Sequence, residues 1–213
     1  MMKQLNVEQL ENIHSNTEIK VVSFLIDRVK KNELGEVPWT KYKYAPAVEF
    51  AIAYNADAVF LKYYVTERSI RAINSDVNST VWEDSCVEFF ISFDDEEPYY
   101  NFEFNCIGTA RVGYGRSQHD RELLPATLIS QVKYQSTIDN HPEEGIHWEL
   151  TLSIPKTLFC FNKIATLEGK KCRVNFYKCG DNLPTPHFIA WSGIQSAEPN
   201  FHLPEFFGIL SFV

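Results

Sequence analysis

The stretch SCVEFFISF at residues 85–93 and the stretch YYNFEFNC at residues 99–106 decide the fold of this chain. In each stretch, apolar and polar side chains alternate with a period of two, which is the pattern of a β-strand with one buried face. The chain carries 16 Phe and 10 Tyr residues, and they are concentrated in runs of this kind. The sequence therefore predicts strands as the main elements of the fold.

Further runs extend this pattern along the chain. Residues 48–54 and 59–65 flank a turn-forming segment, and together they predict a β-hairpin. The remaining predicted strands cover residues 109–114, 130–137, 146–154, 172–179 and 208–213. Short strands in this number, joined by turn-rich connections, indicate an all-β fold of two packed antiparallel sheets. This is a β-sandwich of jelly-roll or immunoglobulin-like type.

Helix is expected to be scarce. Asn6 is a candidate N-cap for a short helix that ends at His14, and the run that begins at Pro155 suggests a single helical turn. The sequence shows no internal repeat and no linker long enough to separate two domains. Residues 1–213 are therefore expected to form one domain, with residues 1–45 packed on the sandwich as an N-terminal segment.

Composition limits the partners and the compartment. Because 20 Lys and Arg residues face 28 Asp and Glu residues, the formal net charge is −8, and a nucleic acid partner is not expected. No stretch approaches the ~20 apolar residues that a membrane helix needs, so no membrane partner is expected.

Because the sequence shows no signal-peptide pattern, the protein is expected to be cytoplasmic. It would be secreted or periplasmic if a leader has been removed. Five cysteines without a CxxC pair indicate free, mostly buried thiols in preference to disulfides or a zinc site.

The alternation along the predicted strands separates core aromatic residues from exposed ones. Trp148 shares a strand face with apolar neighbours and is expected in the core. Trp82 has the same parity as Glu88, which places Glu88 on the outer or concave face with Trp82 at its edge if Phe89 points into the core. An indole beside a carboxylate suits a sugar, because its C–H face stacks on the ring while its hydroxyls donate to the carboxylate. In the alternative interpretation, Trp82 closes one end of the core and Glu88 pairs with an arginine.

Other polar residues are predicted on outer strand faces. Asn101 and Glu103 point outward from one strand, and Asn175 and Tyr177 point outward from another. Trp191 flanks a loop, where binding residues often collect on a β-scaffold. Faces rich in amides, carboxylates and phenols are more typical of a carbohydrate surface than of a metal site. An ordinary solvated sheet face is the alternative.

Four long stretches carry a resemblance to a known family. They read VWEDSCVEFFISFDDEEPYYNFEFNCIGTARVGYG (81–115), HWELTLSIP (147–155), RVNFYKCGD (173–181) and PHFIAWSGIQSAEPNFHLPEFFGILSF (186–212). Together they resemble the family 9 carbohydrate-binding modules, in the compact form that occurs as a free-standing protein. Better-understood members of that family are β-sandwiches whose pocket clamps a terminal glucose-type unit between two tryptophans. The resemblance thus implies non-catalytic binding of a mono- or oligosaccharide.

The resemblance also implies roles for particular residues. Carried over by motif, the clamp would consist of Trp82 and Trp191. Glu88, six positions after Trp82, would accept hydrogen bonds from sugar hydroxyls, and Arg111 would donate to the sugar. Asn175 is a further sugar-binding candidate, on a strand where the match to the family is loose.

No cofactor is required by these motifs, although the family resemblance allows a structural calcium ion. The acidic run at residues 94–97 is the only obvious oxygen-rich cluster, and it lacks a defined ligand spacing. An alternative function is a glycoside hydrolase, or another sugar-active enzyme, that uses Glu88 and Glu103 as its carboxyl pair. A third is a protein-interaction or redox sandwich. If it bound haem, it would need axial His or Met ligands, and a Met ligand within the fold is excluded because the only methionines are Met1 and Met2.

Overall fold

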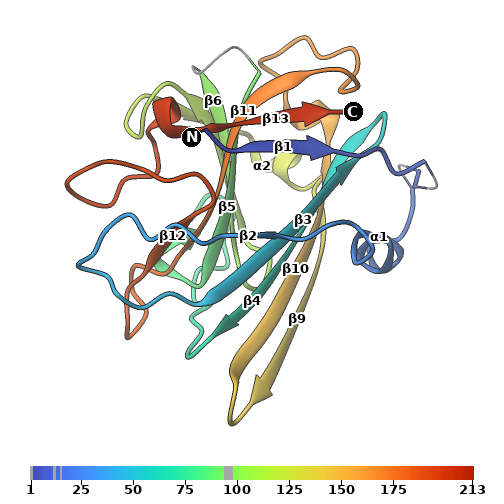
Figure 1. Ribbon diagram of the computed structural model, residues 1–213. Helices are drawn as coiled ribbons and strands as arrows, with labels where there is room; N and C mark the ends of the chain where they lie inside the picture. The colour runs from blue at the N-terminus through green and yellow to red at the C-terminus, as the bar shows by residue number, and fades with distance from the viewer. Residues whose placement is uncertain (1, 12, 15, 94–97) are drawn as a thin grey trace.

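Two packed β-sheets dominate the computed structural model, which describes residues 2–213 except residues 12, 15 and 94–97 (Figure 1). The larger sheet contains β1 (Gln4–Val7), β13 (Gly208–Phe212), β11 (Lys171–Cys179), β5 (Cys86–Ser92), β6 (Tyr99–Asn105), β7 (Ala110–Gly115) and β8 (Arg121–Leu123), in this spatial order, with β12 (Phe188–Ala190) paired to β11. The smaller sheet has the order β2 (Asn32–Glu33), β3 (Ala47–Tyr54), β4 (Ala58–Glu67), β10 (Gly145–Pro155) and β9 (Lys133–His141). This confirms the predicted β-sandwich.

The pairing is antiparallel throughout the named strands except at one place. β1 runs parallel to β13, with Leu5 opposite Leu210, so the beginning and the end of the chain lie side by side. The N-terminal segment also contributes β2 to the smaller sheet, where Asn32 is opposite Phe50. This segment therefore adds one strand to each sheet.

Helices are short, as expected, but their position differs from the prediction. They are α1 (Ile19–Ile26), α2 (Ala126–Ile129) and the 3₁₀ turns Val81–Glu83, Lys156–Leu158 and Pro204–Phe206. The helix predicted from Asn6 to His14 is wrong, because Asn6 lies in β1 and pairs with β13. The sequence signals for α1 are weak, since Glu18 makes no side-chain cap and two of its residues are valines. None of the described helices is both long and apolar enough to cross a membrane.

The main core lies between the two sheets. Phe50 of β3 stacks on Phe176 of β11 with ring centroids 3.9 Å apart, and Phe89 of β5 stacks on Phe176 at 5.2 Å. Trp148 is 1% exposed, which confirms its predicted place in the core. Its indole Nε1 donates to Oε1 of Glu67 at 2.7 Å, so the buried donor is satisfied.

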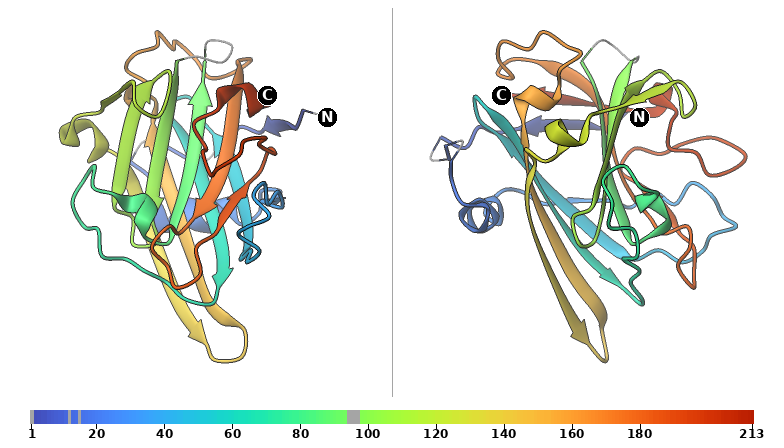
Figure 2. Two further views of the ribbon diagram at one scale, coloured as in Figure 1. Left: turned by 90° about the vertical axis from the view of Figure 1, so that its left-hand side faces the viewer. Right: turned by 180° about the vertical axis from the view of Figure 1, so that it is seen from behind.

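A second apolar cluster covers part of the outer face of the larger sheet. Residues 191–207, here called the covering segment, cross this face between β12 and β13 (Figure 2, left). The Phe201 ring of this segment stacks on Tyr177 of β11 at 4.1 Å, and Trp39 packs against Phe201 at 5.8 Å. The outer face is therefore partly buried, and its uncovered part can hold a site.

Candidate functional site

A hollow of about 270 Å³ lies on the outer face of the larger sheet. It is bordered by the 3₁₀ turn that carries Trp82, by β8 and by the covering segment. Its lining is mixed: it includes carboxylic acids, arginines and amides together with Trp82, Phe188 and Phe201. A concave site with an aromatic wall and convergent polar groups is the usual form of a small-ligand pocket.

Strand register builds the floor of this hollow. Tyr177, Glu88, Glu103 and Arg111 are successive cross-strand partners on β11, β5, β6 and β7. Because side chains alternate along each strand, all four project from the same face of the sheet. Glu88 and Glu103 are 3% and 4% exposed and line the hollow together with Arg111. The predicted outer-face position of Glu88 is thus what the structure shows.

Arg111 connects the floor to the aromatic wall. Its guanidinium carbon lies 4.9 Å from the Trp82 ring centroid, over the ring, in a cation–π arrangement. Its Nη1 also donates to the carbonyl oxygen of Asn78 at 2.7 Å. Asn78 has a left-handed backbone (φ 65°), and its side-chain Oδ1 accepts from the Val112 amide, so this turn is held against β7. The structure therefore brings together Trp82, Glu88 and Arg111, as the family resemblance implies.

A second arginine organises the carboxylate of Glu103. Arg121 Nε donates to Oδ1 of Asn101 at 2.8 Å, and the Asn101 amide nitrogen donates to Oε1 of Glu103. Gly113 makes room for this chain, because a Cβ there would lie 2.8 Å from Asn101 Oδ1. Within the described part of the chain, Oε2 of Glu103 is buried and has no hydrogen-bond partner. A buried acceptor of this kind is costly unless a ligand or water supplies a donor.

Burial changes the proton affinity of the groups in the hollow. It raises the pKa of Glu103 to about 7 and that of Asp181 to about 6. Burial, together with the neighbouring Glu103 carboxylate, raises the pKa of Glu88 well above its usual range. For His202, burial and the two arginines lower the pKa to about 3, so its ring is neutral and bonds to the Tyr99 hydroxyl at 3.0 Å. At neutral pH the hollow thus offers both donors and acceptors without a large net negative charge.

The predicted clamp of two tryptophans is not what the structure shows. Trp191 is 5% exposed and points into the main core, with its ring edge-on to Phe50 at 6.4 Å and to Phe176 at 5.7 Å. Gly208 is needed beside it, since a Cβ there would lie 2.5 Å from the indole. The lining formed by the described residues includes Trp82 but does not include Trp191. Trp191 is therefore a core residue, and this part of the prediction is corrected.

Asn175 also has a structural position. Its Nδ2 donates to the carbonyl oxygen of Ser192 at 3.0 Å, and its Oδ1 accepts from the Ser192 amide at 2.8 Å. The outward parity predicted for Asn175 is correct, but the covering segment lies over it and leaves it fully buried. Asn175 holds that segment on the sheet and does not line the hollow in the described part of the chain.

Several residues that line the hollow were not predicted as site residues from the sequence. Arg121 lies on β8, a three-residue strand with no clear alternation, and His202 lies in the covering segment. Asp181 follows β11 in a turn. Their presence depends on long-range packing, for which the sequence carries no local signal. The calcium prediction rests on residues 94–97, which lie outside the described residues.

Comparisons with known proteins agree with this fold. The sequence profile described as "Carbohydrate-binding family 9" matches residues 20–212. The chain belongs to carbohydrate-binding family 9. A solved structure from Bacteroides uniformis, described provisionally as a carbohydrate-binding protein, is 39% identical over 100% of both chains, with a TM-score of 0.92.

More distant family 9 structures share the fold. A family 9 module from Caldicellulosiruptor kristjanssonii in complex with glucose is 11% identical, with a TM-score of 0.63, over 99% of this chain and 96% of the other. A complex of a family 9 module from the same organism with cellotriose is 12% identical, with a TM-score of 0.62, over 99% and 93%. No curated protein sequence matches the chain.

Proposed function

We propose that this family 9 chain binds a neutral sugar without cleaving it, and that the hollow beside Trp82 receives a single glucose-type unit. The unit would be a free sugar or the terminal unit of an oligosaccharide. Family membership supports a carbohydrate ligand, and the glucose and cellotriose complexes of the Caldicellulosiruptor modules support a glucose-type unit. A hollow of about 270 Å³ suits one small ligand, since pockets for drug-sized molecules begin at ~300 Å³.

One observation carries the proposal: Oε2 of Glu103 is buried and has no hydrogen-bond partner among the described residues, and the hollow that it lines also contains Arg111 and Trp82. A sugar satisfies all three residues at once. One hydroxyl donates to the carboxylate, a second oxygen accepts from the guanidinium, and the apolar C–H face lies against the aromatic side chains. A charged ligand would be less suited, because the hollow contains acids as well as arginines.

The carboxyl geometry favours binding over hydrolysis. A glycosidase places its acid and its nucleophile or base on either side of the scissile bond. Glu88 and Glu103 are direct cross-strand partners and rise from one floor, so both approach a ligand from the same side. Burial also raises the pKa of both groups, which is unfavourable for a nucleophilic carboxylate.

The test is a calorimetric titration of the protein with glucose, cellobiose, cellotriose and a broad panel of other sugars. The wild type is expected to bind glucose-type sugars, and Glu103→Gln is expected to weaken binding at least about tenfold. Glu49→Gln is the matched control, because Glu49 is an exposed acid on β3 of the other sheet. A wild type that binds no sugar in the panel would overturn the proposal. Turnover of aryl glycosides that is lost in Glu88→Gln would replace binding with catalysis.

A further inference from the structure

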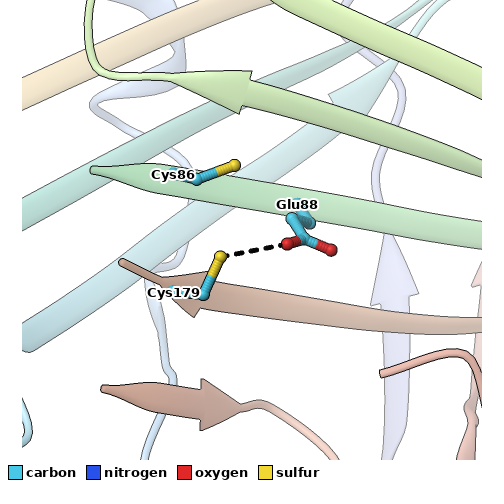
Figure 3. Close-up of side chains that lie close together, drawn as sticks. All are labelled: Cys86, Glu88 and Cys179. Atoms are coloured by element: carbon cyan, nitrogen blue, oxygen red, sulfur yellow. Dashed lines mark hydrogen bonds between the residues drawn. The ribbon is translucent and has the colours of Figure 1, made fainter. Parts of the chain in front are cut away.

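Two cysteines that are far apart in the sequence become direct neighbours on the larger sheet. Cys86 of β5 and Cys179 of β11 are cross-strand partners, and Glu88 follows Cys86 on the same face of β5. Figure 3 shows the three side chains together, with the Cys179 thiol pointing toward the Glu88 carboxyl. The two sulfur atoms and one Glu88 oxygen all lie within 4.8 Å of one another. Register alone therefore assembles two thiols and a carboxyl.

The surroundings of this cluster differ from those of an ordinary buried thiol. Cys179 and Glu88 line the hollow and are 2% and 3% exposed, whereas Cys86 is fully buried. Each thiol makes a long hydrogen bond to a carbonyl oxygen: Cys86 Sγ lies 3.7 Å from that of Val87, and Cys179 Sγ lies 3.6 Å from that of Trp82. Cys179 also donates to Glu88 Oε1 at 3.2 Å. A carboxyl buried beside two thiols has no role in apolar packing.

We propose that Cys86, Cys179 and Glu88 form a binding site for a thiophilic divalent cation of the zinc class, with the remaining coordination position open toward the hollow. Two thiolates and a carboxylate are a ligand set that zinc accepts, and thiolates select against calcium or magnesium. With Zn–S bonds of ~2.3 Å and Zn–O bonds of ~2.1 Å, tetrahedral ligand atoms lie roughly 3.6–3.8 Å apart. Because the ligand atoms lie within 4.8 Å of one another, the observed separations need a contraction of about 1.2 Å at most to reach this geometry.

Neighbouring groups fit the presence of a cation. Asp181 interacts with Cys179 and lines the same hollow, so it offers a further oxygen near the open position. Without a cation the thiols are protonated, since burial raises the pKa of Cys86 to about 12 and that of Cys179 above its usual range. Binding a cation therefore displaces the protons of both thiols and of the Glu88 carboxyl into solvent, and the two thiolates and one carboxylate then carry three negative charges against the two positive charges of the cation. No oxidant or reductant is needed.

The test is a titration of the reduced, full-length protein with Co²⁺, followed by absorption spectroscopy and then by competition with Zn²⁺. One Co²⁺ per chain is expected, with a thiolate-to-cobalt charge-transfer band and the strong visible bands of a tetrahedral site. Cys86→Ser and Cys179→Ser are expected to weaken Co²⁺ binding by about 100-fold or more, since losing even an outer-shell partner costs 10–100-fold. Cys160→Ser is the matched control, because Cys160 is exposed and lies elsewhere.

A second measurement keeps the test independent of whether the variants fold. At a urea concentration that partly unfolds the wild type, saturating Zn²⁺ is expected to protect Cys86 and Cys179 from alkylation, while Cys160 stays reactive. Peptide mass spectrometry measures the alkylation of each cysteine. Absence of a thiolate band in the reduced wild type would overturn the proposal. A band lost only in Cys160→Ser, or a Cys86–Cys179 disulfide that persists under reductant, would also overturn it. None of these readouts requires a sugar, so the outcome is separate from that of the sugar titration.

Discussion

Arg111 lies over one face of the Trp82 ring, with its guanidinium carbon 4.9 Å from the ring centroid. That face of the indole is therefore occupied by the protein's own cation, and a sugar is left with the other face and the edge. The other aromatic side chains that line the hollow in the described part of the chain are Phe188 and Phe201, and no second tryptophan is among them. A ligand in this hollow would therefore contact one tryptophan, Trp82, whereas the family resemblance implies a clamp of two.

Replacement of the two tryptophans should separate binding from stability. Trp82→Ala is expected to weaken sugar binding by about 30-fold, or ~2 kcal/mol, as is typical of a buried aromatic anchor. Trp191→Ala is expected to destabilise the fold by about 3–5 kcal/mol, because it leaves a cavity beside Phe176 in the main core. Calorimetry and urea unfolding of both variants measure the two effects. Trp191→Ala losing affinity while keeping full stability would contradict the structural role of Trp191.

Sugar affinity should depend on pH through Glu103. Burial raises the pKa of this carboxyl to about 7, so it is protonated below that pH and ionised above it. An ionised Oε2 accepts a sugar hydroxyl more strongly than a protonated one. Affinity is therefore expected to rise between pH 6 and pH 8, by at most about tenfold per unit for one coupled proton. Glu103→Gln should bind more weakly with a flatter profile, and an affinity that falls with rising pH in the wild type would refute this role.

Alternation in two strands was enough to predict the floor of the site. Once residues 85–93 and 99–106 are strands, Glu88 and Glu103 must lie on the face opposite Phe89, as they do. Trp191 could not be placed in this way, because its inward direction depends on the space that Gly208 leaves for it in β13.

Two further features were beyond the reach of local patterns. The outward parity of Asn175 was predicted correctly, but its burial results from the covering segment, and no local pattern predicts that this segment lies over Asn175. The five cysteines contain no CxxC pair, which argued against a zinc site, and no local pattern indicates that the register between β5 and β11 makes Cys86 and Cys179 partners. Periodicity thus predicts the face of a residue, whereas tertiary contacts decide what covers it.

Cation and sugar occupancy should be linked, because Glu88 belongs to both proposed sites. A cation that ligates the Glu88 carboxylate removes an acceptor from the sugar, so saturating Zn²⁺ is expected to lower glucose affinity by about fivefold or more. Reciprocity requires that glucose lower the affinity for Zn²⁺ by the same factor. Calorimetry in each order measures both effects. The Zn²⁺ effect should vanish in Cys86→Ser and persist in Cys160→Ser, and equal glucose affinities with and without Zn²⁺ in the wild type would exclude the linkage.

A buried polar network between the sheets should make stability depend on pH. Lys178 Nζ lies 3.0 Å from Oε2 of Glu67 and 2.8 Å from Nε2 of His187. His187 Nδ1 must carry the hydrogen, since it lies 3.1 Å from the Thr185 carbonyl oxygen, so Nε2 accepts from the lysine. A proton on Nε2 would face an ammonium group. Burial and this lysine accordingly lower the His187 pKa to about 4.

The sign of the effect follows from that depressed pKa. The unfolded chain binds the His187 proton below about pH 6.5, whereas the folded chain resists it until about pH 4. The stability contributed by neutral His187 is therefore complete above pH 6.5 and decreases by up to about 3 kcal/mol as the pH falls to 4. The raised pKa values of Asp181 and Glu103 act in the opposite sense over the same range, because their protonated forms are favoured by folding. The free energy of unfolding, measured in urea from pH 4 to pH 7.5, should decrease less on acidification in His187→Gln than in the wild type. Identical pH dependences of this free energy in the two proteins would show that His187 does not titrate with folding.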